Sequence, residues 1–84
     1  MPKITNIEVH LYENKIPKTV NARNYAAAVR TVLKNEYKNV TIDVKLHMGV
    51  AEVFDKTTVE NAAGYDDETA EMVDMFCEEC LAAM

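Results

Sequence analysis

The chain has 84 residues, 49% of them hydrophobic, and a net charge of −5 at pH 7. That apolar content is ample for a core, but no apolar run approaches the roughly 18–20 residues that span a bilayer. Charged and polar residues interrupt the first apolar stretch, which argues against a signal peptide. We therefore expect one compact domain over residues 1–84, in the cytoplasm, with both cysteines reduced.

Charge divides the sequence into two unequal parts. Residues 1–45 carry eight Lys/Arg and four Asp/Glu, a net charge of +4, whereas residues 46–84 carry one Lys and ten acids, a net charge of −9. Such a division bears on how a protein meets its partners more than on its fold. The sequence holds no glycine-rich phosphate loop, no nucleophile elbow and no His-Glu-x-x-His helix. It therefore predicts neither an enzyme nor a cofactor.

The N-terminal segment predicts one strand and a short return. Residues 4–12 place an apolar side chain at every second position from Ile7 to Leu11, which is typical of a half-buried strand. A tight turn then allows residues 15–20 to return as a short second strand. Pro17 would confine that strand to a sheet edge because proline cannot donate to the ladder.

The centre of the chain predicts a helix followed by two strands. Asn21 can accept a hydrogen bond from a first-turn amide, and residues 22–36 then place apolar side chains on one helical stripe. Residues 40–48 alternate again and predict a strand. Residues 50–54 predict a further strand with weaker alternation, close to a glycine that permits a turn at Gly49.

The C-terminal part predicts a turn and a second helix. Residues 62–65 look like a turn, within a stretch over 55–65 for which no regular element is predicted. Asp66 or Asp67 can cap a helix that runs to about Ala83. The expected fold is thus α+β, with an antiparallel sheet of three to four strands, two helices packed on one face, and the order β(β)αββα. The other face of the sheet is expected to be polar and open.

The string Cys77-Glu-Glu-Cys80 is the one motif that suggests metal or redox chemistry. Both cysteines fall on the helix stripe that also holds Met72, which we expect to be buried. His10 and His47 lie on strand positions opposite the apolar residues, so they should point to the far side of the sheet. Ligands on opposite faces cannot converge on one ion, and we therefore interpret the cysteines as core residues and expect no metal.

The last helix carries the clearest pattern. Asp67, Glu71, Asp74 and Glu78 follow one another at spacings of four, three and four residues, which places them along one line of the helix. Like charges at these spacings repel, and no Lys or Arg in the helix offsets them. This pattern suits either an ordinary acidic surface or a docking face for a basic cleft. We take the second interpretation further.

The candidate partner-binding residues are those of this line together with neighbouring residues on the same polar arc. The full set is Asp67, Glu68, Glu71, Asp74, Met75, Glu78 and Glu79. In it, carboxylates would steer a basic partner and an exposed methionine would add apolar contact.

Two other interpretations use different parts of the chain. Arg23, Arg30 and Lys34 share one edge of the first helix and could contact phosphates or offset the acidic helix, although three charges without aromatics make a weak nucleic-acid signal. The open sheet face, or the edge formed by residues 50–54, could instead pair two copies of the chain.

The leading hypothesis is a small cytoplasmic protein-binding module with a Lys/Arg-rich, nucleic-acid-handling protein as its partner. Carboxylates would take the place of phosphates in a basic site and so block it. Compact acidic chains of this kind occur among phage and mobile-element proteins that inhibit host defence systems. That analogy rests on size and charge alone.

Overall fold

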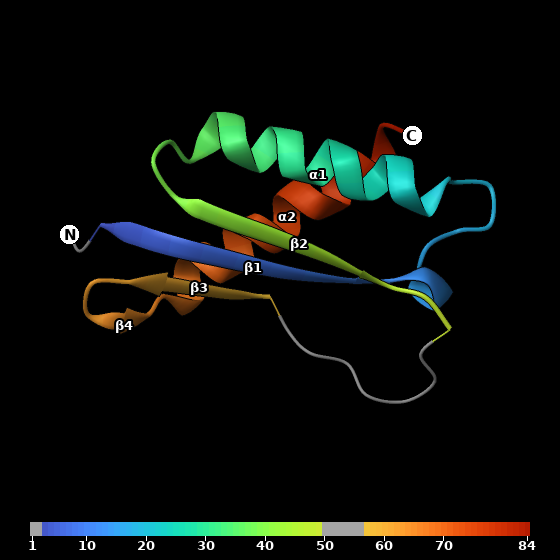
Figure 1. Ribbon diagram of the computed structural model, residues 1–84. Helices are drawn as coiled ribbons and strands as arrows, with labels where there is room; N and C mark the ends of the chain where they lie inside the picture. The colour runs from blue at the N-terminus through green and yellow to red at the C-terminus, as the bar shows by residue number, and fades with distance from the viewer. Residues whose placement is uncertain (1–2, 50–56) are drawn as a thin grey trace.

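The computed structural model describes residues 3–49 and 57–84. Within these ranges the chain forms four strands, two α-helices and one turn of 3-10 helix (Figure 1). In order they are β1 (Ile4–Tyr12), η1 (Glu13–Lys15), α1 (Ala22–Glu36), β2 (Thr41–His47), β3 (Thr58–Asn61), β4 (Gly64–Tyr65) and α2 (Asp67–Ala82). The α+β class and the two predicted helices are confirmed.

The sheet is mixed, and this corrects the prediction of a purely antiparallel sheet. Its strand order is β2-β1-β3-β4, with β1 parallel to β2 and antiparallel to β3. The cause lies in the connection between β1 and β2. The 15 residues of α1 span about 22 Å, nearly the length of the seven-residue strand β2 at about 23 Å. The helix thus carries the chain back to the end of the sheet where β1 began, and β2 runs in the same direction as β1.

The short strand predicted over residues 15–20 is absent from the structure. Glu13 to Lys15 form η1 instead, and the amides of Ile16 and Val20 donate to the carbonyl oxygens of Glu13 and Pro17. These two local turns use backbone groups that a strand would have offered to the sheet. The strand predicted over residues 50–54 lies outside the described residues.

A hairpin forms much of the stretch for which no element was predicted. β3 and β4 are joined by a turn at Ala62 and Ala63, and β4 begins at Gly64 with φ of +134°, which side-chain-bearing residues rarely adopt. The predicted turn over 62–65 is therefore right for its first half, while its second half pairs as a strand. A bulge at Thr5, between the pairs that Ile4 and Asn6 make with β3, completes this edge of the sheet.

Both helices begin at the side-chain caps that the sequence suggests. Asn21 Oδ1 accepts from the Asn24 amide at 3.1 Å, and Asp66 Oδ1 accepts from the Thr69 amide at 3.0 Å. After α1, Asn39 adopts a left-handed conformation with φ of 61°, which asparagine tolerates well. Neither helix of the described residues is long and apolar enough to cross a membrane.

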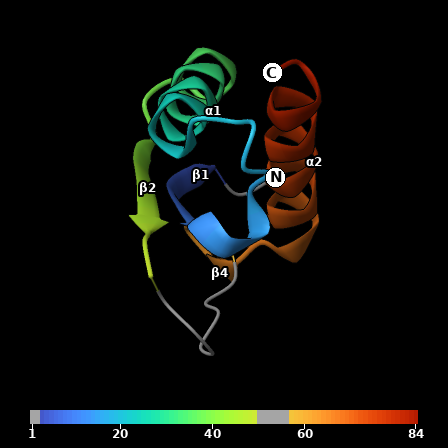
Figure 2. The same ribbon diagram turned by 90° about the vertical axis from the view of Figure 1, so that its right-hand side faces the viewer.

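The core lies between one face of the sheet and the two helices. Ile7, Val9 and Leu11 of β1 are buried there, in one cluster with side chains from β2, β3, α1 and α2. The two helices pack side by side on this face (Figure 2). Tyr25 of α1 donates a buried hydrogen bond of 3.0 Å to the carbonyl oxygen of Cys77, in the middle of α2. This bond and the shared core set the orientation of α2 against the sheet.

Candidate functional site

The seven predicted partner-binding residues all lie on α2, and all seven are exposed. The helix buries Val73 and Cys77 against the core, and its opposite side faces solvent. We call the line formed by Asp67, Glu71, Asp74 and Glu78 the acidic ridge. The four carboxylates span about 17 Å along the helix axis. The structure therefore presents them as one continuous row, as the spacing predicts.

The charges of the acidic ridge are not neutralised within the described part of the chain. None of the ion pairs between described residues involves a ridge carboxylate. The basic edge of α1 does not offset them by direct pairing, although α1 and α2 are in contact. Arg30 donates instead to the carbonyl oxygen of Val44 at 3.4 Å, on the side of α1 next to β2. Among the described residues, the ridge carboxylates therefore remain without a cationic partner.

A second line of side chains runs beside the ridge, and one of its members was predicted to be buried. Glu68, Met72, Met75 and Glu79 follow the same four-three-four spacing, and we call this line the outer flank. Met72 is 52% exposed and Met75 is 58% exposed. Burial of Met72 was wrong because Val73 and Cys77 set the direction of the core, and Met72 lies about 100° away from Val73 around the helix.

The two cysteines take the structural role expected of them. Cys77 is buried, Cys80 is half-buried, and both are free thiols. Burial, reinforced by the nearby Asp74 carboxylate, raises the pKa of Cys77 to about 12. Burial also raises the pKa of Cys80. Such thiols stay protonated near neutral pH, which disfavours both thiol exchange and metal binding. Residues 3–49 and 57–84 contain no cluster of three or more potential metal ligands.

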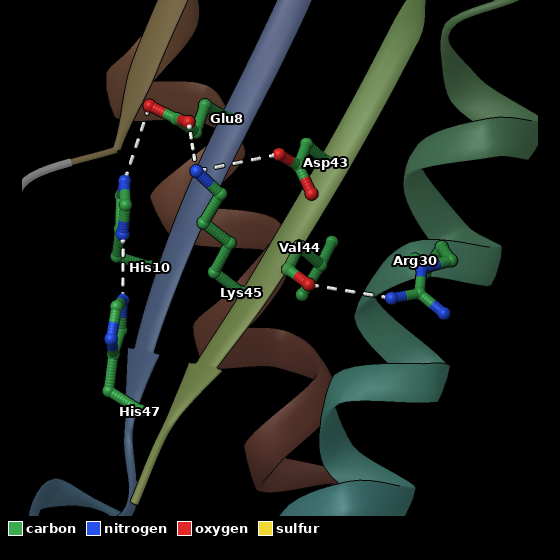
Figure 3. A network of polar contacts seen from close by, with 7 residues as sticks. All are labelled: Glu8, His10, Arg30, Asp43, Val44, Lys45 and His47. Carbon is green, nitrogen blue, oxygen red and sulfur yellow. Dashed lines mark hydrogen bonds and ion pairs between the residues drawn. The ribbon is translucent and has the colours of Figure 1, made fainter.

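The far face of the sheet holds a different arrangement of charge, which we call the sheet network (Figure 3). Lys45 Nζ lies 2.9 Å from Glu8 Oε1 and 3.7 Å from Asp43 Oδ2. Glu8 Oε2 lies 3.3 Å from His10 Nε2, and His10 Nδ1 lies 2.9 Å from His47 Nε2. Carboxylates, an ammonium group and two imidazoles thus form one connected chain across β1 and β2.

The contact between the two histidines is a hydrogen bond between rings that lie edge to edge. Their planes differ by 16° and their centroids are 5.1 Å apart, about the separation of two coplanar imidazoles joined in line. A carboxylate can only accept, so His10 Nε2 carries the proton donated to Glu8. In the bond between the two rings one nitrogen donates and the other accepts, and the tautomers of the two imidazoles decide which does so.

This face is less open than predicted. Tyr12 is only 6% exposed, and the side chain of His10 is only 7% exposed. The ring of Tyr12 stacks on that of His47, with centroids 4.7 Å apart and planes 15° apart. The stacking of Tyr12 on His47 covers one side of each ring, which the alternation of polar and apolar residues could not reveal.

The charged groups of the sheet network pair with one another. The hydrogen bond from Lys45, aided by the one from His10, lowers the pKa of Glu8, and the same pairing with Glu8 raises the pKa of Lys45. The ammonium group of Lys45 lies between the two carboxylates. Nothing among these residues supplies an activated nucleophile, so the geometry favours a structural role over catalysis.

No protein family, curated protein or solved structure was found to match this chain. Its function must therefore be inferred from its surfaces. Of the two polar surfaces, the sheet network is internally paired, whereas the carboxylates of α2 pair with no cation of residues 3–49 and 57–84. The face of α2 is accordingly the better candidate for a binding site.

Proposed function

We propose that this protein is a protein-binding module that places α2 in a Lys/Arg-lined site of a nucleic-acid-handling protein and blocks that site by charge mimicry. One observation carries the proposal. The seven side chains of the candidate site are all exposed on one helix, and no cation of the described residues pairs with its carboxylates. A partner with a basic cleft would supply the missing positive charge.

The charge density of α2 supports mimicry of a nucleic-acid strand. Six carboxylates lie between Asp67 and Glu79, a length of about 18 Å along the helix. That is one negative charge per about 3 Å, compared with one per about 3.4 Å along a single strand of B-DNA. A site shaped to neutralise phosphates would therefore meet a similar number of charges per unit length on α2.

The outer flank adds apolar contact area, which the carboxylates alone do not provide. Exposed charges accelerate encounter and are weakened by salt, whereas well-packed apolar side chains slow dissociation. Met72 and Met75 are each more than half exposed in the middle of the acidic face. Methionine is flexible and adapts to irregular surfaces, so these two side chains suit the centre of an interface.

An inhibitor from a phage or mobile element, acting in the cytoplasm on a host defence system, is the biological setting that we propose. A small protein that occupies a phosphate-binding site needs no chemistry of its own. The absence of a recognisable catalytic motif in the sequence agrees with such a role.

Capture from a bacterial lysate tests the proposal, with two immobilised variants of equal net charge beside the native protein. The ridge variant carries Asp67→Asn, Glu71→Gln, Asp74→Asn and Glu78→Gln. The scattered control carries Glu13→Gln, Glu36→Gln, Asp43→Asn and Glu60→Gln, all at exposed positions outside α2. Both changes raise the net charge from −5 to −1.

We expect the native protein and the scattered control to retain the same nucleic-acid-handling protein and the ridge variant to lose it. Equal retention by all three would overturn the proposal. A chain that self-associates in sedimentation while retaining nothing would favour pairing of two copies through the sheet. Salt-sensitive binding of DNA or RNA by the native protein, lost when Arg23, Arg30 and Lys34 are changed to Gln, would favour a direct nucleic-acid binder.

A further inference from the structure

A groove runs between α2 and the C-terminal half of β1. It has a volume of about 680 Å³, within the range of about 300–1,000 Å³ that small-molecule pockets occupy. Asp67, Glu71 and Asp74 line it from α2. Three of the four ridge residues therefore line the groove, and we call them its acidic rim, whereas Glu78 and the outer flank do not line it.

The apolar part of the lining is called the floor of the groove here. It comprises Leu11 of β1, Ile16 after η1, Tyr25 of α1 and Leu81 near the end of α2, and polar side chains such as His10 and Thr57 line the groove as well. Tyr25 is held in place by its hydrogen bond to Cys77, so the floor is attached to the same helix that provides the acidic rim. An apolar floor beneath carboxylates suits a side chain with a long alkyl stem and a cationic end.

We propose that this groove receives an arginine side chain of the basic partner, and this inference rests on the proposed function. A guanidinium group can form two parallel hydrogen bonds with a carboxylate, and its stem can pack on Leu11 and Ile16. Charge complementarity identifies the occupant: an acidic rim above an apolar floor attracts a cation that also has apolar surface. Lys15 also lines the groove and lowers the net negative charge there.

The groove divides the carboxylates of α2 into two sets that can be tested against each other. The groove variant carries Asp67→Asn, Glu71→Gln and Asp74→Asn. The comparison variant, called the flank variant, carries Glu68→Gln and Glu79→Gln of the outer flank together with Glu78→Gln of the acidic ridge. Both variants remove three charges from the same helix, but only the groove variant removes carboxylates that line the cavity. Circular dichroism establishes that both retain the native helix content.

The probe is a fluorescein-labelled nona-arginine peptide, titrated by anisotropy and followed by amide chemical shifts of the native protein. We expect the groove variant to weaken binding by about tenfold and the flank variant by less than about threefold. We also expect the amides of Leu11, Ile16 and Tyr25 to shift, and Lys15→Ala to bind more tightly than the native protein.

Equal weakening by the two variants, without shifts around the groove, would overturn the inference and leave charge mimicry by the whole face intact. Failure of the native protein to bind the peptide would overturn the inference as well. The lysate capture described above decides the proposed function separately, because it compares all four ridge carboxylates with acids elsewhere on the surface.

Discussion

The two polar surfaces of this protein differ in whether their charged side chains are paired. In the sheet network, Glu8 and Asp43 share the ammonium group of Lys45, and Glu8 also accepts from His10. On α2, the acidic ridge and outer flank present six carboxylates that pair with no cation among the described residues. One surface stabilises its own fold, and the other keeps repulsive charge exposed.

This difference indicates where a partner would bind. Paired charges offer little to a ligand, because any new contact must replace an existing one. An unpaired row of like charges costs helix stability, and a partner that neutralises it recovers that cost on binding. The comparison therefore predicts that equivalent substitutions in the two regions act in opposite directions.

The largest effect is expected on binding to the captured partner. The ridge variant removes four exposed charge interactions worth about 0.2–1 kcal/mol each, or about 1–4 kcal/mol together. This corresponds to a rise in Kd of about 5- to 800-fold. Isothermal titration calorimetry at two salt concentrations would show it, together with a weaker dependence on salt. The scattered control should bind as the native protein does; an equal loss would assign the effect to net charge.

The second effect concerns the apolar part of the outer flank. Met75→Ala should weaken partner binding by about 1–2 kcal/mol, as truncation of a central interface side chain does. It should leave the free energy of unfolding within about 0.5 kcal/mol of the native value, since the side chain is exposed. Surface plasmon resonance should place the change in the dissociation rate. Met84→Ala is the matched control, because Met84 is 51% exposed but lies beyond the end of α2. Equal effects of the two substitutions would remove Met75 from the interface.

The third effect is a gain in the free energy of unfolding, which most substitutions lower. Glu71→Gln, Asp74→Asn and Glu78→Gln together remove four repulsive pairs at spacings of three or four residues, counting those that Asp67 and Glu68 make with Glu71. Each pair costs about 0.2–0.5 kcal/mol, so the variant should be more stable than the native protein by about 0.8–2 kcal/mol. Urea denaturation would measure this gain. A loss of stability would show that the acidic ridge contributes to the fold and would remove the contrast with the sheet network.

The smallest effect is expected from Glu8→Gln, which should lower stability at neutral pH. The pKa of Glu8 is lowered in the folded protein, chiefly by Lys45, so the charged form is the one that the fold favours. Its contribution is present above the unfolded value of about 4.3 and is lost as pH falls through the lower, folded pKa. The difference in Tm between the native protein and Glu8→Gln should therefore be clear at pH 7 and shrink toward pH 3. A difference that does not change with pH would contradict this role for Glu8.

The pKa of Lys45 is raised, so its contribution behaves in the opposite way. It is present below the unfolded value of about 10.4 and is lost as pH rises through the folded pKa. The sheet network should therefore lose part of its stabilising effect at both ends of the pH scale.

The faces of the two helices and of β1 could be predicted from the sequence because burial follows a local period. The helical period also predicted correctly that every candidate residue of α2 lies on the exposed side of the helix. Strand direction could not be obtained in this way, since it depends on where α1 returns the chain. Met72 was misplaced because its position at the margin of the apolar stripe depends on how α2 tilts against its neighbours.

Contacts within the sheet network also depend on information that the sequence pattern lacks. The alternation of side chains along a strand predicted that His10 and His47 lie on the same face of the sheet. It predicted neither their hydrogen bond nor the position of Glu8 beside His10. The register of β1 against β2 determines both. The groove beside the acidic ridge is lined by residues from β1 and the turn after it, from α1, from α2 and by Thr57, and no local spacing predicts it.

Competition with nucleic acid on the captured partner tests charge mimicry most directly. A labelled oligonucleotide bound to that partner would be titrated with the native protein and, separately, with the ridge variant. We predict that the native protein displaces the oligonucleotide and that the ridge variant requires a much higher concentration. A stable complex of partner, oligonucleotide and native protein together would contradict the account, because two ligands cannot occupy one basic site at the same time.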